Sequence, residues 1–448
     1  MSLVIILLLV IAFIVVATTK FKLHPFVALL LAAFIAAFAY QLPVNTITGT
    51  ISNGVGGLLG QIGLVIVLGT IIGTVLEKSG AAITMAEFII KLLGQRFPTL
   101  TMSIIGYIVS VPVFCDSGFV ILNSLKESMA KRMSISPVAM SVALATGLYA
   151  THTFVPPTPG PIAAAGNLGL EDNLGLVIVI GIFIAAAAAI AGMLWANRFA
   201  NIDPDIIDEQ ATQLAEVSRE SYGELPSAGK AFAPIFIPIL LICLGSIANL
   251  PSRPFADGAL FETLLFLGTP LNALIVGLLL SIRLIKGDKR IADFSERVSE
   301  GLTSAAPILL ITGAGGAFGA VLKATELGNY LGTTLSALGI GLFMPFIVAA
   351  ALKTAQGSST VALVTTSALV APMLAQLGLD SEMGRVLTVM AIGAGAMTVS
   401  HANDSFFWVV SQFGKMSVSL AYRAQTIATL VQGCVVMLLT YLLSLFLL

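Results

Sequence analysis

Long apolar runs dominate the pattern of hydrophobic and polar positions along the chain. A run of about 20 apolar residues is long enough to cross a bilayer as a helix, and eight uninterrupted runs come close to that length. They lie near 2–18, 24–41, 58–76, 175–197, 232–250, 269–285, 303–322 and 425–448. Four further apolar stretches are broken by polar, glycine or proline clusters, at 98–131, 138–170, 340–376 and 386–413. This pattern predicts an all-α polytopic membrane protein with several broken helices.

Composition supports this class and argues against others. Of 448 residues, 57% are hydrophobic and only 10% are charged, whereas a soluble domain has about 25% charged residues. The net charge of −1 argues against a nucleic-acid-binding surface. The first apolar stretch lacks the basic segment and the small-residue cleavage site of a signal peptide, so we expect it to be retained as a helix. The lipid bilayer is therefore the expected surrounding of the protein.

One hydrophilic segment divides the chain into two halves that resemble each other. This linker, 201–230, separates a first half, 1–200, from a second half, 231–448. Five matches occur in the same order and at a nearly constant offset. They pair KLHPFVALLLAAFI (22–35) with LGTPLNALIVGLLL (267–280), GTVLEKSG (73–80) with GAVLKATE (319–326), Pro98 with Pro345, CDSG (115–118) with AQGSST (355–360), and ATHTFVPPTPGP (150–161) with VSHANDSFF (399–407). We therefore predict an internal repeat.

The two repeats are expected to be inverted relative to each other. If 98–131 and 340–376 are re-entrant hairpins, each half has five transmembrane helices plus one hairpin, and this odd number inverts the second half. The loop expected at 283–301 carries five basic residues, whereas its repeat counterpart at 42–55 has no charge. Because basic loops stay cytoplasmic, the pattern predicts a cytoplasmic linker and both termini outside.

Polar clusters inside the broken stretches are the candidate binding site. Non-helical backbone at membrane depth is tolerated only where protein buries it or where it lines a watery cavity. Paired broken helices in inverted repeats commonly form the midplane site of a secondary transporter. The helix N-termini exposed at such breaks favour anions. We therefore expect the broken helices to meet at the midplane around a small organic anion.

The clusters of the first half and their counterparts have two interpretations each. The GSST segment, 357–360, is either a small-residue helix contact or a ligand-binding hairpin tip, and its match with CDSG favours the tip. Asp116 is either held by backbone at a turn, or contacts substrate hydroxyls or carries a coupling proton. The segment VPPTPGP, 155–161, has four prolines and breaks a helix in either case. Its freed backbone groups are expected to line the site.

Ionisable residues near the breaks are the candidates for proton coupling. His152 and His401 precede the two breaks at corresponding places, and each is either a packing residue or part of the site. Asp404, which has polar neighbours on both sides, is the strongest single candidate because it is unlikely to face lipid. Lys353 pairs either with a substrate carboxylate or with a neighbouring acid.

Motifs of enzymes and cofactor sites are not found. There is no GxxxxGK[ST] loop for ATP-driven transport, no HExxH, and no evident GxSxG. Three histidines without a cysteine partner set do not make a metal site. An intramembrane hydrolase with Asp116 and Asp404 as its acids is disfavoured, because the repeat pairs Asp116 with 355–360 and not with Asp404. We expect neither an enzyme nor a cofactor; a Na⁺/H⁺-type antiporter stays open as an alternative.

Five motifs together resemble one transporter family. GTVLEKSGAA, CDSGFVIL, THTFVPPTPGP, GSSTVALVT and SHANDSFFW, which extend over essentially the whole chain, are similar to those of the bacterial gluconate:proton symporter (GntP-type) permeases of the ion-transporter superfamily. The resemblance implies a homodimer in the inner membrane that moves its substrate site like an elevator. It also implies a proton gradient as the driving force. The implied substrates are gluconate and related sugar acids, with D-serine or glycerate in some members.

The resemblance also implies the site residues. For the substrate these are Asp116, Ser117, Gly118, Thr151, His152, Pro156, Pro157, Gly357, Ser358, Ser359, Thr360 and Asn403; for the coupling proton they are Asp404 and His401. Two departures from gluconate carriers stand out. CDSG replaces a glutamate-containing aromatic stretch, and Thr158 replaces the histidine of PPHPGP. If both positions contact the polyol end of the ligand, a shorter hydroxy acid such as glycerate is the alternative substrate.

Overall fold

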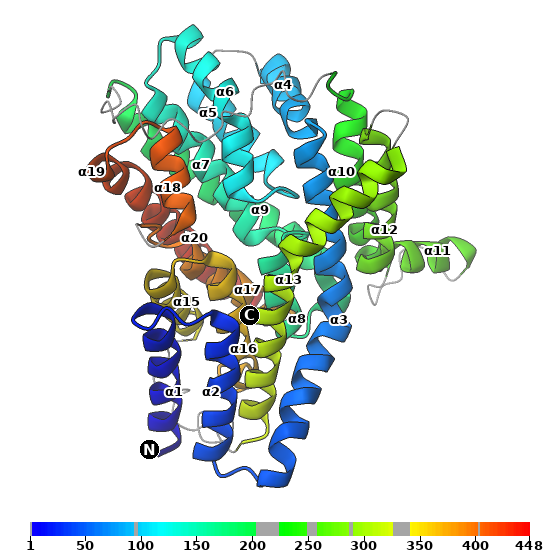
Figure 1. Cartoon of the computed structure of the whole chain (residues 1–448), viewed down its shortest axis with the longest axis vertical. Helices are drawn as coiled ribbons and strands as arrows, with labels where there is room; N and C mark the ends of the chain where they lie inside the picture. Colours follow the sequence, from blue (N-terminus) through cyan, green and yellow to red (C-terminus); the bar gives the residue numbers. More distant parts are fainter. Residues whose placement is uncertain are drawn as a thin grey trace.

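The computed structural model of the chain describes residues 2–93, 97–202, 224–248, 258–285, 290–325, 341–401 and 404–448. Within these ranges the regular secondary structure is entirely helical (Figure 1). Five helical segments are long and apolar enough to cross a membrane, and up to seven if two bent helix pairs are counted. The predicted all-α architecture with several apolar helices of membrane-spanning length is therefore confirmed.

Two long helices form one side of the molecule. They are α3 (Val44–Lys78) and α13 (Arg290–Lys323), which run antiparallel and pack along each other (Figure 1). At about 1.5 Å per residue each is roughly 50 Å long, more than the ~30 Å of a bilayer core. The crossing point is a contact of two glycines: a Cβ atom on Gly54 would lie 2.6 Å from the carbonyl oxygen of Gly316. Only glycine permits this close approach of the two backbones.

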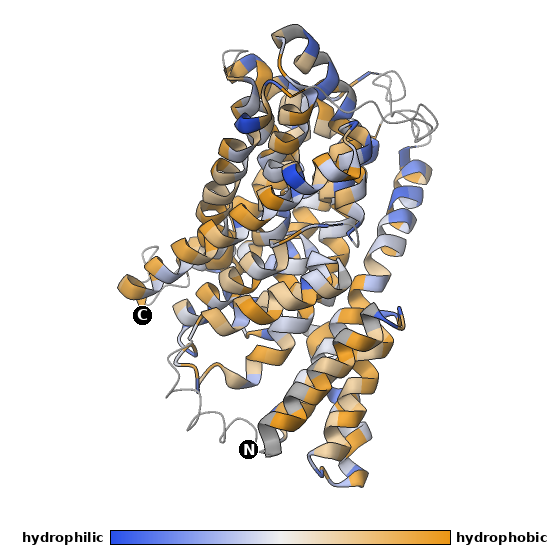
Figure 2. Cartoon of the chain, turned by 90° about the vertical axis from the view of Figure 1, so that its left-hand side faces the viewer, coloured by the Kyte–Doolittle hydropathy of each residue, from blue (hydrophilic) through white to orange (hydrophobic). Residues whose placement is uncertain are grey.

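Shorter helices surround this pair. On one flank lie α1 (Ser2–Thr19) and α2 (Pro25–Ala39), and on the other lie α10 (Ala228–Ala248), α11 (Ala259–Gly268) and α12 (Pro270–Ser281). α2 packs on α13, whereas α12 packs on α3. Figure 2 shows that hydrophilic segments gather at the upper end of the molecule, opposite the N-terminus, while hydrophobic residues cover its body.

The other half of the molecule contains the broken helices. They are α5 (Pro98–Val109) with α6 (Cys115–Met133), α7 (Pro137–Phe154) with α8 (Pro159–Asn167), α15 (Phe343–Gln356) with α16 (Ser359–Val370), and α17 (Glu382–Met397) with α18 (Ser405–Phe413). α7 packs between α5 and α9 (Leu174–Ala196), and α17 packs between α15 and α20 (Ile427–Leu447). α4 (Ala81–Leu93) and the one-turn α19 (Val418–Ala421) complete this half.

Local sequence explains each break. α7 ends before the proline run because a proline lacks the N–H that a helix interior needs. α15 ends at Gly357, whose φ of +88° is left-handed and favours glycine. α16 and α18 then begin with side-chain caps: Ser358 accepts a hydrogen bond from the Val361 N–H, and Asp404 accepts one from the Phe406 N–H.

The structure corrects several predicted elements. The loops expected at 42–55 and 283–301 are wrong, because α3 already begins at Val44 and α13 at Arg290. The amphipathic α4 was not predicted, since its thirteen residues include Glu87 and Lys91 and make no continuous apolar run. Most of the predicted linker, residues 203–223, lies outside the described residues.

Candidate functional site

Three helix N-termini meet at one cavity of about 270 Å³. The first residues of α6, α16 and α18 line it, and α7 closes it from the side. A helix N-terminus has unpaired backbone N–H groups and the positive end of the helix dipole. Hydroxyl groups stand beside them, since the lining includes Ser358, Ser359, Thr360 and Ser405. The cavity is therefore suited to a small anion with hydroxyl groups.

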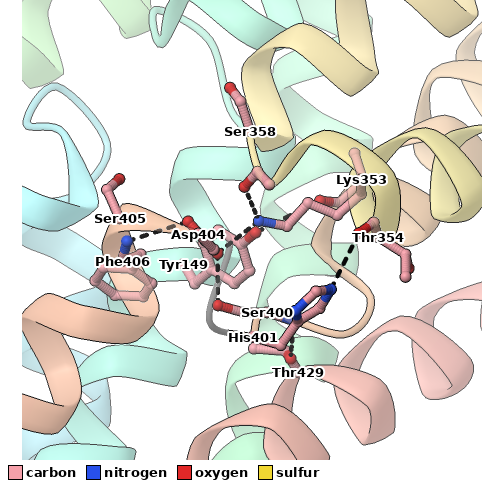
Figure 3. Close-up of polar contacts among 12 residues, drawn as sticks. Tyr149, Lys353, Thr354, Ser358, Ser400, His401, Asp404, Ser405, Phe406 and Thr429 are labelled. Carbon is pink, nitrogen blue, oxygen red and sulfur yellow. Dashed lines mark hydrogen bonds and ion pairs between the residues drawn. The ribbon is translucent and has the colours of Figure 1, made fainter. Parts of the chain in front are cut away.

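A buried ion pair lies beside this cavity. Nζ of Lys353, on α15, is 2.5 Å from Oδ2 of Asp404, the N-cap of α18, and the two side chains are 1% and 7% exposed (Figure 3). Lys353 also donates to the carbonyl oxygen of Gly357. Asp404 accepts two more hydrogen bonds, from the Ser400 hydroxyl at 2.5 Å and from the Phe406 N–H at 3.1 Å. The pair thus joins the end of α15 to the start of α18.

The segment between α17 and α18 is held from two sides. His401 donates from Nε2 to the Thr354 carbonyl oxygen at 3.0 Å (Figure 3). Ser400 donates its N–H to the Thr429 hydroxyl and accepts a hydrogen bond from the Thr426 hydroxyl at its carbonyl oxygen. These contacts fix the backbone from which Asp404 reaches the cavity.

Asp116 is the second acid of the cavity. It lies in the first turn of α6, where its Oδ1 accepts a hydrogen bond from the Ser405 hydroxyl at 3.1 Å. Its Oδ2 accepts one from the Cys115 thiol at 3.6 Å. Asp404 forms an ion pair with Lys353, whereas Asp116 forms none among the described residues. The two acids therefore stand in different electrostatic surroundings.

Two side chains of α7 form the wall opposite the helix N-termini. The Tyr149 ring lies 5.8 Å from Lys353 Nζ and 5.3 Å from the Phe406 ring, measured to the ring centroids. The Tyr149 hydroxyl donates to the Ala396 carbonyl oxygen at 3.4 Å. His152 is 5% exposed, and its Nδ1 has no hydrogen-bond partner among the described residues. A buried polar atom of this kind is costly unless a ligand or water satisfies it.

The structure brings together about half of the residues predicted for the site. Seven of them line the cavity: Asp116, His152, Gly357, Ser358, Ser359, Thr360 and Asp404. Six others lie outside its lining: Ser117, Gly118, Thr151, Pro156, Pro157 and His401. Asn403 lies outside the described residues.

The outlying residues have structural contacts instead. The Thr151 hydroxyl donates to the Tyr107 carbonyl oxygen at 2.8 Å, and Gly118 packs on Leu148. The Thr158 hydroxyl donates to the Val155 carbonyl oxygen at 2.7 Å and is outside the lining. The Thr158 hydroxyl therefore donates within its own turn, and its contact with the ligand stays a prediction.

Sequence reasoning missed the aromatic parts of the site. Tyr149 and Phe406 were not predicted, although a single tyrosine within the apolar α7 is a usable signal. The sequence favours neither a substrate carboxylate nor a neighbouring acid as the partner of Lys353, and the structure pairs it with the acid Asp404. Asp116 and Asp404, both expected at the site, line the same cavity, so the repeat match of Asp116 with 355–360 does not keep the two acids apart. Acids of a hydrolytic dyad share one proton, whereas Asp404 here has a cationic partner of its own.

Among the described residues, no group of three histidine, cysteine or acidic side chains is placed to hold a metal ion.

Comparisons with known proteins find a matching family, similar sequences and a similar fold. The model of the GntP family permeases matches residues 1–446. The gluconate permease of Pseudomonas aeruginosa is 32% identical over 418 residues, which cover 92% of this chain and 91% of that protein. The D-serine transporter DsdX of Escherichia coli is 33% identical over 446 residues, which cover 98% and 97%. Among solved structures, the YdaH transporter of Alcanivorax borkumensis shares the fold with a TM-score of 0.60 at 16% identity, over 91% of this chain and 90% of that one.

Proposed function

Since the chain belongs to the GntP family of permeases, we propose that it is a proton-coupled symporter of the bacterial inner membrane. It imports gluconate or a related small hydroxylated monocarboxylate. The observation that carries this proposal is the convergence of three helix N-termini on one cavity lined with hydroxyl groups. Backbone N–H groups at such termini bind a carboxylate, and the hydroxyls beside them bind the alcohol groups of the substrate.

Individual residues have separate roles in this proposal. The tips of the two hairpins, Ser358–Thr360 and Asp116, hold the hydroxylated end of the substrate. His152 accepts or donates a hydrogen bond at Nδ1, which supplies the partner that this buried atom lacks. Asn403 is proposed as a further polar contact, next to Asp404. Asp404, His401, His152 and Asp116 are the candidates for the coupling proton.

D-Serine or D-glycerate is the second candidate substrate. The observation that favours D-serine is the position of Asp116, whose carboxylate lines the cavity without an ion-paired cation among the described residues. An ammonium group on the substrate would supply that cation. The E. coli relative named as a D-serine transporter and the P. aeruginosa relative named as a gluconate permease are similarly identical to this chain, at 33% and 32%.

The architecture proposed with this function is a pair of inverted repeats. Each consists of five transmembrane helices and one re-entrant hairpin, formed by α5–α6 in the first repeat and α15–α16 in the second. The lengths of α5, α15 and α16, between 12 and 14 residues, support re-entrant segments, because a full span needs about 20. We further propose a homodimer with both termini outside, in which the broken helices move together past α3 and α13 as an elevator.

Transport by the purified protein tests this function. Proteoliposomes are loaded at neutral pH and given an imposed inward proton gradient, and uptake of radiolabelled gluconate is followed with unlabelled glycerate and D-serine as competitors. We expect uptake that an uncoupler abolishes and that protein-free liposomes do not show. The competitor ranking identifies the substrate. If none of the three compounds is moved or competes, the proposed substrate class is wrong, and Na⁺-dependent proton movement without organic ligand then tests the antiporter alternative.

A further inference from the structure

We propose that Asp116 carries the coupling proton, whereas Asp404 stays ionised as the fixed partner of Lys353. This inference rests on the proposed proton-coupled symport and assigns its proton to one side chain. It follows from the different partners that the structure gives to the two acids of the cavity.

The surroundings of Asp404 favour its charged form. A buried ammonium group lies 2.5 Å from Oδ2, and a hydroxyl and a backbone N–H also donate to the carboxylate. An opposite charge and several hydrogen-bond donors both stabilise an ionised carboxylate. Protonating Asp404 would leave the Lys353 ammonium buried without a counter-charge, and such a buried unpaired ion is strongly disfavoured. Asp404 is therefore a poor proton carrier while Lys353 stays charged.

The surroundings of Asp116 are the reverse. Its donors are one hydroxyl, from Ser405, and one weak thiol donor, from Cys115. Two charges lie near it: Asp404, a like charge whose carboxylate lines the same cavity, and Lys353, whose ammonium group is already paired with Asp404. Two carboxylates that share a site do not both ionise readily. Because Lys353 already neutralises Asp404, the proton that relieves this repulsion goes to Asp116.

The helices packed on α6 form no ion pair with Asp116 among the described residues. α5 carries no charged residue, and α7 presents only Tyr149 and His152 to the cavity. On α3, Glu77 accepts a hydrogen bond from Ser117 and is paired with Lys78 at 3.9 Å, so α3 brings one acid and one base near this turn. The charged residues of α4, Glu87 and Lys91, are one acid and one base. The helices packed on α6 therefore leave Asp116 in surroundings that favour a bound proton.

Charge balance then gives a coupling rule. With the Asp404–Lys353 pair neutral, the empty cavity has a charge of −1 when Asp116 is ionised. A monocarboxylate would raise this to −2, but one proton on Asp116 returns the loaded cavity to −1. The proton enters from water on the outer side, forms an O–H bond on the Asp116 carboxylate, and returns to water on the inner side with the substrate. One proton per monocarboxylate is the expected ratio.

Asparagine substitutions separate the two acids. Asp116→Asn imitates a permanently protonated Asp116. Its exchange of substrate between equal internal and external pools should be slower, because a contact to the substrate changes, and the exchange that remains should be independent of pH. Accumulation driven by a proton gradient should be lost. The single variant Asp404→Asn leaves the Lys353 ammonium buried without its partner, so it could fail to transport because it fails to fold. The variant compared with Asp116→Asn is therefore Lys353→Met combined with Asp404→Asn. This double variant removes both charges of the pair, and the substrate uptake that it retains should still be driven by a proton gradient.

Each outcome bears on one of the two proposals. If Asp116→Asn still accumulates substrate under a gradient, or if the double variant loses accumulation but keeps exchange, the assignment of the proton to Asp116 is overturned. A wild-type protein that exchanges neither gluconate, glycerate nor D-serine overturns the proposed function instead. Infrared difference spectra between acidic and neutral pH provide a readout without substrate. We expect a protonated-carboxyl band that is present in the wild type and the double variant and absent in Asp116→Asn; its persistence in Asp116→Asn would also overturn the assignment.

Discussion

The ammonium group of Lys353 lies 2.5 Å from the Asp404 carboxylate, so a single buried ion pair joins the end of α15 to the start of α18. The residue after Asp404 extends this connection, because the Ser405 hydroxyl donates to Asp116 at the start of α6. Segments that are far apart in the sequence, in both halves of the chain, are thereby linked at the cavity. The packing of these helices beside the cavity therefore depends on a few polar contacts.

Removal of one member of the ion pair should destabilise the fold. Lys353→Met leaves Asp404 buried without its cation, and the expected loss is roughly 3–5 kcal/mol. Thermal unfolding in detergent, followed by intrinsic fluorescence, measures this loss as a lowered melting temperature. Lys323→Met is the matched control, because Lys323 is exposed at the end of α13 and should change the melting temperature little.

The double variant tests the cause of this loss. Lys353→Met with Asp404→Asn removes both charges, so it should melt at a higher temperature than Lys353→Met alone. Replacement of a whole buried pair by neutral groups is often close to neutral for stability. A double variant that melts as low as Lys353→Met would mean that packing around the lysine, and not its charge, is what stabilises this region.

The driving force of transport should depend on the charge of the substrate. If one proton accompanies one monocarboxylate, the transported charge is zero, so a pH gradient drives uptake and a membrane potential alone does not. In proteoliposomes, an imposed potassium diffusion potential with valinomycin and no pH gradient separates the two forces. D-Serine is a zwitterion, and its ammonium group would take the place of the proton beside an ionised Asp116. Its uptake should therefore follow its own concentration gradient and respond to neither force, whereas gluconate uptake that responds to the potential alone would contradict the one-to-one ratio.

Much of the architecture is predictable because membrane helices obey simple length and polarity rules. Apolar runs locate α9 and α10, and the proline run and Gly357 locate two of the breaks. The sequence does not show where long helices begin, since the first turns of α3 and α13 are polar enough to look like loops. It also does not show which polar groups share a cavity. Asp116 and Ser405 are 289 positions apart in the sequence. Their contact depends on how the helices pack, and the match between the two repeats does not predict it.

The cavity lining can be examined through Cys115. Its side chain is 2% exposed and lines the cavity next to Asp116. In a protein with Cys243→Ser and Cys434→Ser, a small thiol-specific reagent should modify Cys115 slowly, because burial limits access, and bound substrate should slow it further. Mass spectrometry measures the modified fraction over time. The single-cysteine protein with only Cys434, which is exposed on α20, is the control and should react at the same rate with and without substrate. Equal rates for Cys115 under both conditions would remove the α6 tip from the binding site.

A second buried lysine contacts the C-terminal end of α18. Lys126 on α6 is fully buried, and its ammonium group donates to the Phe413 carbonyl oxygen at 2.9 Å and to the Ser141 hydroxyl at 3.0 Å. Phe413 is the last residue of α18, where a cation is stabilised by the helix dipole and by the unpaired carbonyls.

Lys126→Met leaves that carbonyl oxygen without its donor and Glu127, 3.2 Å from the ammonium group, without its cation. We expect a loss of about 3 kcal/mol in the free energy of unfolding, and faster modification of Cys115, because α6 and α18 would be less firmly joined beside the cavity. Lys131→Met, on the exposed side of the same helix, serves as the control and should change neither quantity. If Lys126→Met lowers the melting temperature but leaves the Cys115 rate unchanged, the lysine stabilises the fold without controlling access to the site.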